Sequence, residues 1–105
     1  MHYILFYDVE GGYVEGRAKF RAGHLDLARQ AHQRGDLVLA GALADPVDGA
    51  VLVFRSGEAA EAFAQADPYV RNGLVKSWRV RQWSTVIGDG ASLPGMDEEA
   101  ASPHP

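Results

Sequence analysis

Residues 15–34, EGRAKFRAGHLDLARQAHQR, form the longest helix-like pattern in the chain, and the predicted fold is built around them. Wound at about 100° per residue, their apolar side chains gather on one arc with His24 at its centre. Arg17, Arg21 and His32 fall inside the same arc. Because burying an unpaired charge is costly, we expect an anionic group to meet this inward face.

The composition of the chain predicts one domain and limits its partners. With 105 residues, 47% of them hydrophobic, the chain is long enough for one compact domain and too short for two of ordinary size. No apolar run approaches the roughly 20 residues of a membrane span, so we expect a soluble, cytoplasmic protein. The lack of cysteine excludes disulfides and thiol nucleophiles. Acidic and basic residues balance up to Ile87, which disfavours nucleic acid and favours a small molecule or protein as partner.

Strand-like and helix-like segments follow one another in an informative order. Strands are predicted over residues 2–8, 37–43, 50–54 and 75–87, and helices over residues 15–34 and 59–66, with a helical turn at 69–72. The order strand, helix, strand, strand, helix, strand is that of the ferredoxin-like βαββαβ plait. We therefore predict an α+β domain over residues 1–87, with helices on one face of a four-stranded antiparallel sheet.

The open face of that sheet and the end of the chain give further predictions. The first strand, HYILFYD, is apolar on both alternating faces, so a second copy of the sheet is the simplest cover, and we predict a homodimer with facing sheets. In the last strand the parity of the apolar positions changes between Val80 and Trp83, which predicts a β-bulge near Arg81 and Gln82. Residues 88–105 are rich in Gly, Ser, Pro and acidic residues and are predicted to form a flexible acidic tail.

His24 and Asp67 are the candidate catalytic residues, and each has a structural alternative. An imidazole titrates near neutrality, so His24 can be a general acid or base at a pocket rim, or a core histidine with a local hydrogen bond. Asp67 lies at the abrupt end of the second helix, where a carboxylate can hold an imidazole in one tautomer. Asp67 before Pro68 is also a typical helix N-cap, and on local grounds capping is the favoured explanation.

Arg17, Arg21 and Tyr69 are candidate substrate-binding residues. A planar guanidinium suits an anionic substrate group, and the alternative for both arginines is pairing with acids such as Asp8 and Glu10. The Tyr69 phenol can donate a proton or pack as a wall residue, and packing is the favoured reading. The histidines lack metal-ligand spacing with one another, so we predict neither a metal nor a cofactor.

Four groups of short motifs occur in order along the chain: Arg17-x-x-x-Arg21-x-x-His24-Leu25, Gly35-x-Leu37 with Ala40-Gly41-x-Leu43, Asp67-Pro68-Tyr69-Val70 with Gly73-Leu74, and Trp78-x-Val80. Together they resemble the YciI-like family. The resemblance implies a dimeric ferredoxin-like α/β barrel group, similar in fold to muconolactone isomerase, with a His-Asp pair in a pocket. His24 and Asp67 match that pair. Family members with assigned chemistry act on small ring compounds by proton abstraction with loss of a leaving group.

The sequence departs from the family pattern at two places. Gly41-Ala42-Leu43 stands where the family often has Gly-Pro-Leu, and Gln82 stands where proline often precedes the last tryptophan. The first change affects the pocket wall, where Gly41 is a further candidate substrate contact.

The leading functional hypothesis is a small enzyme in which His24 and Asp67 transfer a proton on a small cyclic or anionic metabolite, by isomerisation or elimination. The alternative is a non-catalytic dimer that binds a small ligand as a sensor or carrier. An RNA-binding module of the same plait is disfavoured, because residues 50–54, AVLVF, lack the aromatic and basic pattern of an RNA-binding sheet. No sequence feature favours the oxygen chemistry of the related nogalamycin-type monooxygenases.

Overall fold

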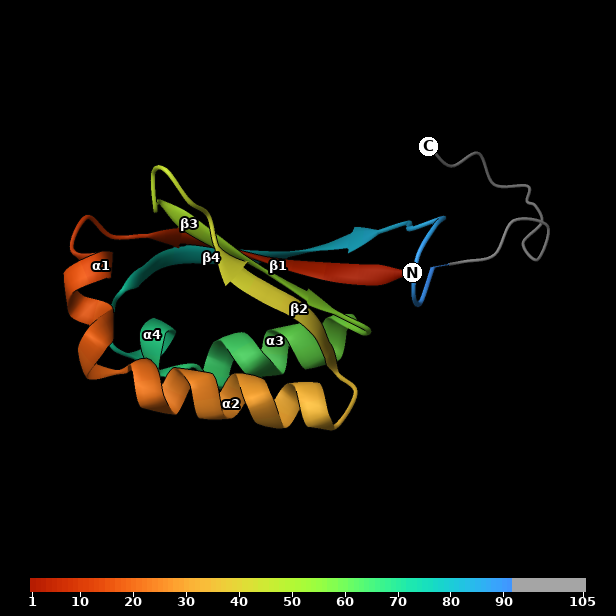
Figure 1. Cartoon of the computed structure of the whole chain (residues 1–105), viewed down its shortest axis with the longest axis horizontal. Coiled ribbons are helices and arrows are strands. Elements are labelled where there is room, and N and C mark those ends of the chain that lie inside the picture. Colours follow the sequence, from red (N-terminus) through yellow and green to blue (C-terminus); the bar gives the residue numbers. More distant parts are fainter. Residues whose placement is uncertain (92–105) are drawn as a thin grey trace.

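Helices pack on one face of a four-stranded sheet in the computed structural model, which describes residues 1–91 (Figure 1). The elements are β1 (His2–Val9), α1 (Tyr13–Gly16), the 3-10 turn η1 (Arg17–Lys19), α2 (Arg21–Gln33), β2 (Leu37–Ala42), β3 (Gly49–Phe54), α3 (Gly57–Ala66), α4 (Pro68–Arg71) and β4 (Val75–Trp83). The strand order is β2-β3-β1-β4, and all neighbours are antiparallel. The predicted α+β fold is confirmed, and its element order is consistent with a ferredoxin-like plait. Within the described residues, no helix has the length and hydrophobicity needed to cross a membrane.

The core lies between the inner face of the sheet and α3. Side chains alternate between the two faces along β1 and β3, so Leu5, Leu52 and Phe54 all point toward the helices and are at most 2% exposed. On α3, the alanines Ala60 and Ala64 are fully buried, and the Phe63 ring lies 5.4 Å from the Phe54 ring. Small side chains let this helix approach the sheet closely, while the two phenylalanines fill the remaining space.

Both ends of α3 are set by local sequence, and its C-terminal end positions the candidate site. The Ser56 hydroxyl accepts a hydrogen bond from the Ala59 N–H, a cap whose removal typically costs about 1 kcal/mol. At the other end, Pro68 disfavours helical backbone at Asp67, which adopts φ −67° and ψ 123°. Pro68 then becomes the first residue of α4. The chain therefore turns sharply at Asp67, beneath the sheet and next to α2.

The predicted helix over residues 15–34 is wrong in one respect, because it is broken into α1, η1 and α2. The last break falls at Phe20, which has φ −112° and ψ 5°, and no side chain caps either break. Gly16 lies so close to Leu74 that a Cβ there would be 2.7 Å from the leucine Cδ2. The contact with Leu74 holds α1 against the residue that precedes β4. Helical periodicity is a local pattern and does not reveal a contact between residues so far apart in the sequence.

Strand β4 is also shorter and more regular than predicted. Its pairing with β1 is continuous from His2↔Trp83 to Asp8↔Ser77, so the predicted bulge near Arg81 is wrong. The only register shift in this pair lies between Asp8 and Val9. The change of parity in the apolar positions reflects the two faces of a regular strand. Trp78 and Val80 face the helices, whereas Trp83 lies on the opposite face.

No helix covers that opposite face within the described residues (Figure 1). Leu39 is 71% exposed there and Trp83 is 47% exposed, and the Arg79 guanidinium lies 4.5 Å from the centre of the Phe6 ring. The register places further half-buried apolar side chains on this face, namely Ile4, Val51 and Val53. The face is apolar toward β2 and β3, whereas Asp8, Ser77, Arg79 and Arg81 lie on its β4 side, and the homodimer stays a prediction.

Residues 84–91 fold back along the end of the sheet. The Thr85 hydroxyl lies 2.8 Å from Nδ1 of His2, and the terminal nitrogen of Met1 donates a 2.7 Å hydrogen bond to the Gly90 carbonyl. Thus the first residues of the predicted tail, 88–91, contact the start of β1. The remainder of that predicted tail, residues 92–105, lies outside the described residues.

Candidate functional site

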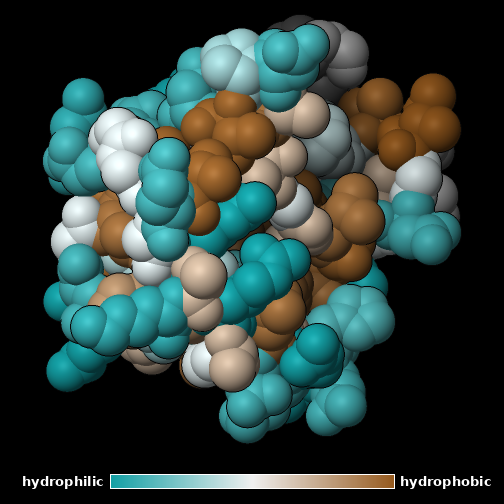
Figure 2. Space-filling model, turned by 60° about the vertical axis from the view of Figure 1, so that its left-hand side comes forward, coloured by the Kyte–Doolittle hydropathy of each residue, from teal (hydrophilic) through white to brown (hydrophobic). Residues whose placement is uncertain are grey.

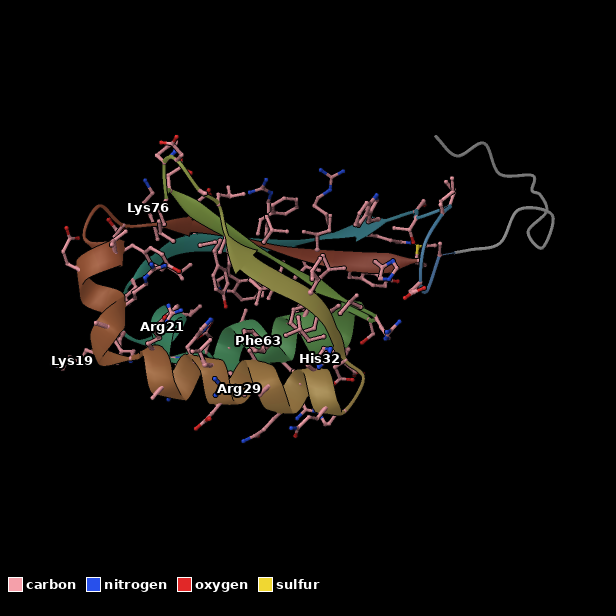
Figure 3. All side chains as sticks on the ribbon, viewed as in Figure 1. Lys19, Arg21, Arg29, His32, Phe63 and Lys76 are labelled. Atoms are coloured by element: carbon pink, nitrogen blue, oxygen red, sulfur yellow. The ribbon has the colours of Figure 1, made fainter. Side chains whose placement is uncertain are left out.

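A cavity of about 280 Å³ lies between the helices and the inner face of the sheet. Its helical side comes from α1, η1, α2 and α4, and its sheet side comes from β1, β2 and β3. The cavity gathers five of the six predicted site residues along its lining, Arg17, Arg21, His24, Gly41 and Tyr69. Figure 3 shows Arg21 at the start of α2, between that helix and the sheet, with Lys19 at the outer end of the molecule. Figure 2, which brings the α1 end forward, shows hydrophilic groups in a band between hydrophobic surfaces.

Asp67, the sixth predicted residue, lies behind this lining and is fully buried. Its Oδ1 atom accepts a 3.0 Å hydrogen bond from the Tyr69 N–H and lies 2.9 Å from Nδ1 of His24. Its Oδ2 atom accepts a 2.7 Å hydrogen bond from the Tyr7 hydroxyl. The carboxylate thus caps α4 and contacts His24 at the same time, so the two interpretations of Asp67 are compatible.

His24 lies in the first turn of α2 with its side chain 17% exposed. Its ring stacks on the Tyr69 ring, with 3.9 Å between centroids and 6° between planes, and meets the Phe63 ring edge-on. Because an ionised carboxylate only accepts hydrogen bonds, the contact with Asp67 assigns the proton to Nδ1. Nε2 of His24 is then left as a free acceptor in a side chain that lines the cavity.

Tyr7 belongs to this network and was not among the predicted site residues. Burial raises the pKa of the Tyr7 hydroxyl, and the negative charge of Asp67 raises that pKa further. The phenol therefore stays protonated and serves as a hydrogen-bond donor to Asp67. The alternation of side chains along the first strand places Tyr7 on the same face as Leu5. The alternation does not predict that its hydroxyl donates to Asp67, which lies 60 residues later in the chain.

Arg17 and Arg21 form no ion pair with any carboxylate in residues 1–91, so the predicted alternative of pairing with Asp8 or Glu10 is not observed. Asp8 instead accepts a hydrogen bond from Ser77 and lies 4.0 Å from Arg79, its neighbours on β4. The Arg17 guanidinium lies 5.3 Å from the centre of the Tyr13 ring. Both arginines thus bring positive charge to the cavity, and neither has a carboxylate at ion-pair distance among residues 1–91.

The Tyr69 ring is 1% exposed, and its hydroxyl has no hydrogen-bond partner of acceptable geometry in the described part of the chain. Burial raises the pKa of this hydroxyl, with a smaller contribution from Tyr13, whereas the charge of Arg21, the approach of its side chain as a hydrogen-bond donor and the charge of Arg17 oppose the rise. Packing therefore accounts for the ring of Tyr69 but leaves its hydroxyl unexplained.

The part of the cavity wall that β2 forms consists of small residues. Gly41 lies between Ala40 and Ala42 on β2, and a Cβ at Gly41 would meet no atom within 4 Å. His32, which shares the inward arc of the sequence pattern, lies farther along α2 in a separate groove. Among residues 1–91, no three His, Cys, Asp or Glu side chains are grouped as a metal site requires.

Known proteins resemble this chain over most of its length. A family model described as the YCII-related domain matches residues 1–84. Protein YciI of Escherichia coli O6:H1 and that of Shigella flexneri are each 31% identical over 98 residues, spanning 83% of this chain and 100% of each relative. The solved structure of 5-chloro-2-hydroxyhydroquinone dehydrochlorinase, TftG, from Burkholderia phenoliruptrix AC1100, in complex with 2,5-dihydroxybenzoquinone, has a similar fold. It gives a TM-score of 0.67 at 18% identity, over 88% of this chain and 100% of that chain. The resemblance inferred from the motifs is confirmed, and the chain belongs to the YCII-related family.

Proposed function

We propose that this protein is an acid–base enzyme that transfers a proton on a small ring compound, with His24 as the base and Asp67 as its positioning residue. The observation that carries the proposal is the 2.9 Å contact between Nδ1 of His24 and Oδ1 of Asp67, beside a cavity that the histidine lines. A base held in one tautomer, with its other nitrogen free, has the arrangement that proton abstraction requires.

In the proposed reaction, Nε2 of His24 takes a proton from a saturated ring carbon of the bound substrate, as in a lactone or in the keto tautomer of a hydroxybenzene. The buried carboxylate of Asp67 then stabilises the imidazolium that forms, while Tyr7 and the Tyr69 N–H hold the carboxylate in place. In an elimination, the carbon–hydrogen electron pair forms a new double bond and the leaving group departs with its own bonding pair. In an isomerisation, His24 returns the proton to a different carbon. General base catalysis of this kind typically contributes about 10²–10⁴ in rate.

Similarity to TftG supports elimination as the first reaction to test. That protein is described as a dehydrochlorinase, and its structure holds a dihydroxylated quinone. A planar ring of this size fits a cavity of about 280 Å³. Arg17 and Arg21 line the cavity and form no ion pair within the described residues, which supports a substrate that carries negative charge.

The alternative is a protein that binds a small ligand in the same cavity without changing it. Arg17 and Arg21 favour ligand binding whether or not chemistry follows, because two cations with no carboxylate beside them attract an anion. The two functions differ in turnover, which a sensor or carrier does not have.

Halide release and lactone isomerisation, measured on panels of chlorinated hydroxybenzenes and small lactones, test the proposal. We expect turnover by the parent protein that His24→Gln abolishes. His32→Gln is the matched control, because it removes an exposed histidine of the same helix that does not line the cavity. Turnover that persists in His24→Gln would contradict the proposed base. Ligand binding without turnover on either panel would favour the sensor or carrier.

We also propose that the protein works in the cytoplasm as a homodimer whose apolar sheet faces lie against each other. The support for the dimer is the open face, which is apolar toward β2 and β3, with Leu39 71% exposed at its edge. We expect light scattering to give twice the chain mass for the parent, and Leu39→Glu to lower that mass toward the monomer. Val14→Glu, a matched change at an exposed position on α1, should leave the mass unchanged. A parent protein that is monomeric at micromolar concentration would overturn the dimer.

A further inference from the structure

The cavity contains a second polar group besides His24. The hydroxyl of Tyr69 is buried and has no hydrogen-bond partner in residues 1–91, although Tyr69 itself lines the cavity. Arg21 lies near enough to lower the pKa of that hydroxyl both by its charge and by the approach of its side chain as a donor, and the charge of Arg17 acts in the same direction. The cavity is therefore lined by the Tyr69 hydroxyl, which has no acceptor for its proton, and by Arg17 and Arg21, which form no ion pair with a carboxylate in residues 1–91.

Such a group of side chains is unfavourable when the cavity is empty of anions. A buried polar group without a partner typically costs more free energy than a hydrogen bond returns, and most proteins satisfy nearly all of theirs. A guanidinium can donate to the phenol oxygen but cannot accept its proton, because arginine has no acceptor. The missing partner must therefore accept a hydrogen bond, and next to Arg21 the favoured acceptor is a negatively charged oxygen.

The position of His24 relative to this group limits what the acceptor can be. The imidazole and phenol rings are stacked at 3.9 Å and nearly parallel, and both residues line the same cavity. A planar ligand that offers a proton to His24 can therefore place an oxygen substituent of the same ring at Tyr69. This arrangement is what removal of a proton next to a carbonyl group needs, since the electron pair moves onto the oxygen.

We propose that the Tyr69 hydroxyl, with Arg21 and Arg17, forms an oxyanion subsite for the phenolate or enolate oxygen of a ring substrate. The inference rests on the proposed function and deepens it by naming the substrate class. As His24 takes the ring proton, the carbon–hydrogen pair forms a carbon–carbon double bond and the carbonyl pair moves onto oxygen. Tyr69 and Arg21 then stabilise that oxygen. When a leaving group departs, the same electrons return from the oxygen through the ring and expel the group with its bonding pair.

The probe for this subsite is 4-nitrophenol, whose absorbance reports its ionisation, and 4-nitroanisole is the neutral analogue of the same shape. At a pH below the solution pKa of 4-nitrophenol, we expect the parent protein to bind the ionised form, so that the phenolate band grows as protein is added. The phenolate should bind about tenfold to hundredfold more tightly than 4-nitroanisole, as expected for hydrogen bonds to a charged group. Equal affinity for the two probes, or binding of neither, would overturn the subsite.

Variants assign the effect to individual side chains. Tyr69→Phe and Arg21→Gln should each lower phenolate affinity about tenfold or more and leave 4-nitroanisole affinity unchanged. Arg34→Gln removes an exposed arginine that pairs with Asp36 outside the cavity, and it should change neither affinity. Arg21 is exposed at the surface of α2, so its variant remains informative if Tyr69→Phe fails to fold. Unchanged phenolate affinity in folded Tyr69→Phe would overturn the assignment of the hydroxyl.

Binding and turnover can fail separately. His24→Gln keeps Tyr69, Arg21 and Arg17, so it should still bind the phenolate while it loses turnover. Phenolate binding without turnover on any substrate panel would sustain the subsite and overturn the enzyme. Turnover that depends on His24 but shows no preference for the phenolate would sustain the enzyme and overturn the subsite.

Discussion

His24 and His2 lie near opposite ends of the fold, and their surroundings differ in the sign of the neighbouring charge. His24 contacts the buried carboxylate of Asp67 through Nδ1 and lines a cavity. His2 is 5% exposed, contacts the neutral hydroxyl of Thr85 through Nδ1, and lies against Trp83. Burial lowers the pKa of His2, and the positive charges of the terminal amine and Arg55 lower it further, against an opposing hydrogen bond from the Asp89 backbone.

If His24 is the base that we propose, burial alone would not have selected it, because His2 is the more buried histidine. Residues 84–91 pack against His2, with the Thr85 hydroxyl at Nδ1 and Gly90 close to Nε2. His24 is partly exposed, and its partner is an anion that can stabilise a proton taken from elsewhere. His24 therefore differs from His2 in two features, the carboxylate partner at its Nδ1 atom and the cavity that its side chain lines.

The largest contrast should appear when each histidine is replaced by glutamine. His24→Gln should lower turnover by about 10²–10⁴, the usual contribution of a general base. His2→Gln should leave turnover unchanged, since its ring lies outside the cavity. Steady-state kinetics on a substrate from the turnover panels would measure both, and an equal loss in the two variants would remove the proposed distinction.

Asp67→Asn should give the next largest effect, because it removes the negative charge and keeps a side chain able to cap α4. We expect a smaller loss of turnover than in His24→Gln and a shift of the His24 proton away from Nδ1 toward a mixture of tautomers. The nitrogen chemical shifts of the imidazole measure the tautomer directly. Superimposable spectra for parent and variant would mean that Asp67 acts as a cap alone.

Tyr7→Phe should reduce stability, because it leaves Oδ2 of the buried Asp67 without its donor. We expect a loss of about 1–3 kcal/mol in the free energy of unfolding at neutral pH. Above pH 10.0, the ordinary pKa of tyrosine, the unfolded parent releases the Tyr7 proton while the folded parent retains it. Parent stability should therefore fall as pH rises, and the variant should lose this part of the dependence. Tyr3→Phe, a hydroxyl with no hydrogen bond in the described residues, is the control in chemical denaturation.

The smallest expected effect concerns His2 and acid. Because the folded pKa of His2 lies below its ordinary value of 6.5, the unfolded chain binds a proton first as pH falls. The His2 contribution to stability is thus fully present above 6.5 and is lost as pH falls toward the folded pKa. Denaturation at about pH 7.5 and about pH 5.5 should show a weaker pH dependence in His2→Gln than in the parent. The same slope in both proteins would contradict a lowered pKa of His2 in the folded chain.

The sequence was sufficient to predict the order of elements, because strand alternation and helical periodicity are local patterns. It was also sufficient to select both His24 and Asp67, although capping and pairing stood as alternatives for the carboxylate. The structure shows that they coexist, since the two oxygens of Asp67 accept from Tyr69, Tyr7 and His24 together. The catalytic roles stay predictions.

Features that depend on long-range contacts could not be read from the sequence. The break at Phe20 accompanies the approach of Gly16 to Leu74, which lies far along the chain. The partner of Asp8 is set by the register of β1 against β4, and that register brings Ser77 and Arg79 beside it. The predicted pairing of Asp8 with Arg17 or Arg21 therefore failed, because sequence patterns alone do not give the register of β1 against β4.

The wall of small residues on β2 has a consequence for protein engineering. Ala40, Gly41 and Ala42 line the cavity, whereas every side chain assigned to proton transfer comes from α2 or from the segment at Asp67. In the proposed mechanism, the β2 wall that shapes the cavity and the residues that transfer the proton therefore lie on separate elements of the scaffold. A combinatorial library at Ala40 and Ala42, whose side chains share the inward face with Leu52 and Ala50, would narrow the chamber and retune substrate selection while the proton-transfer residues keep their sequence.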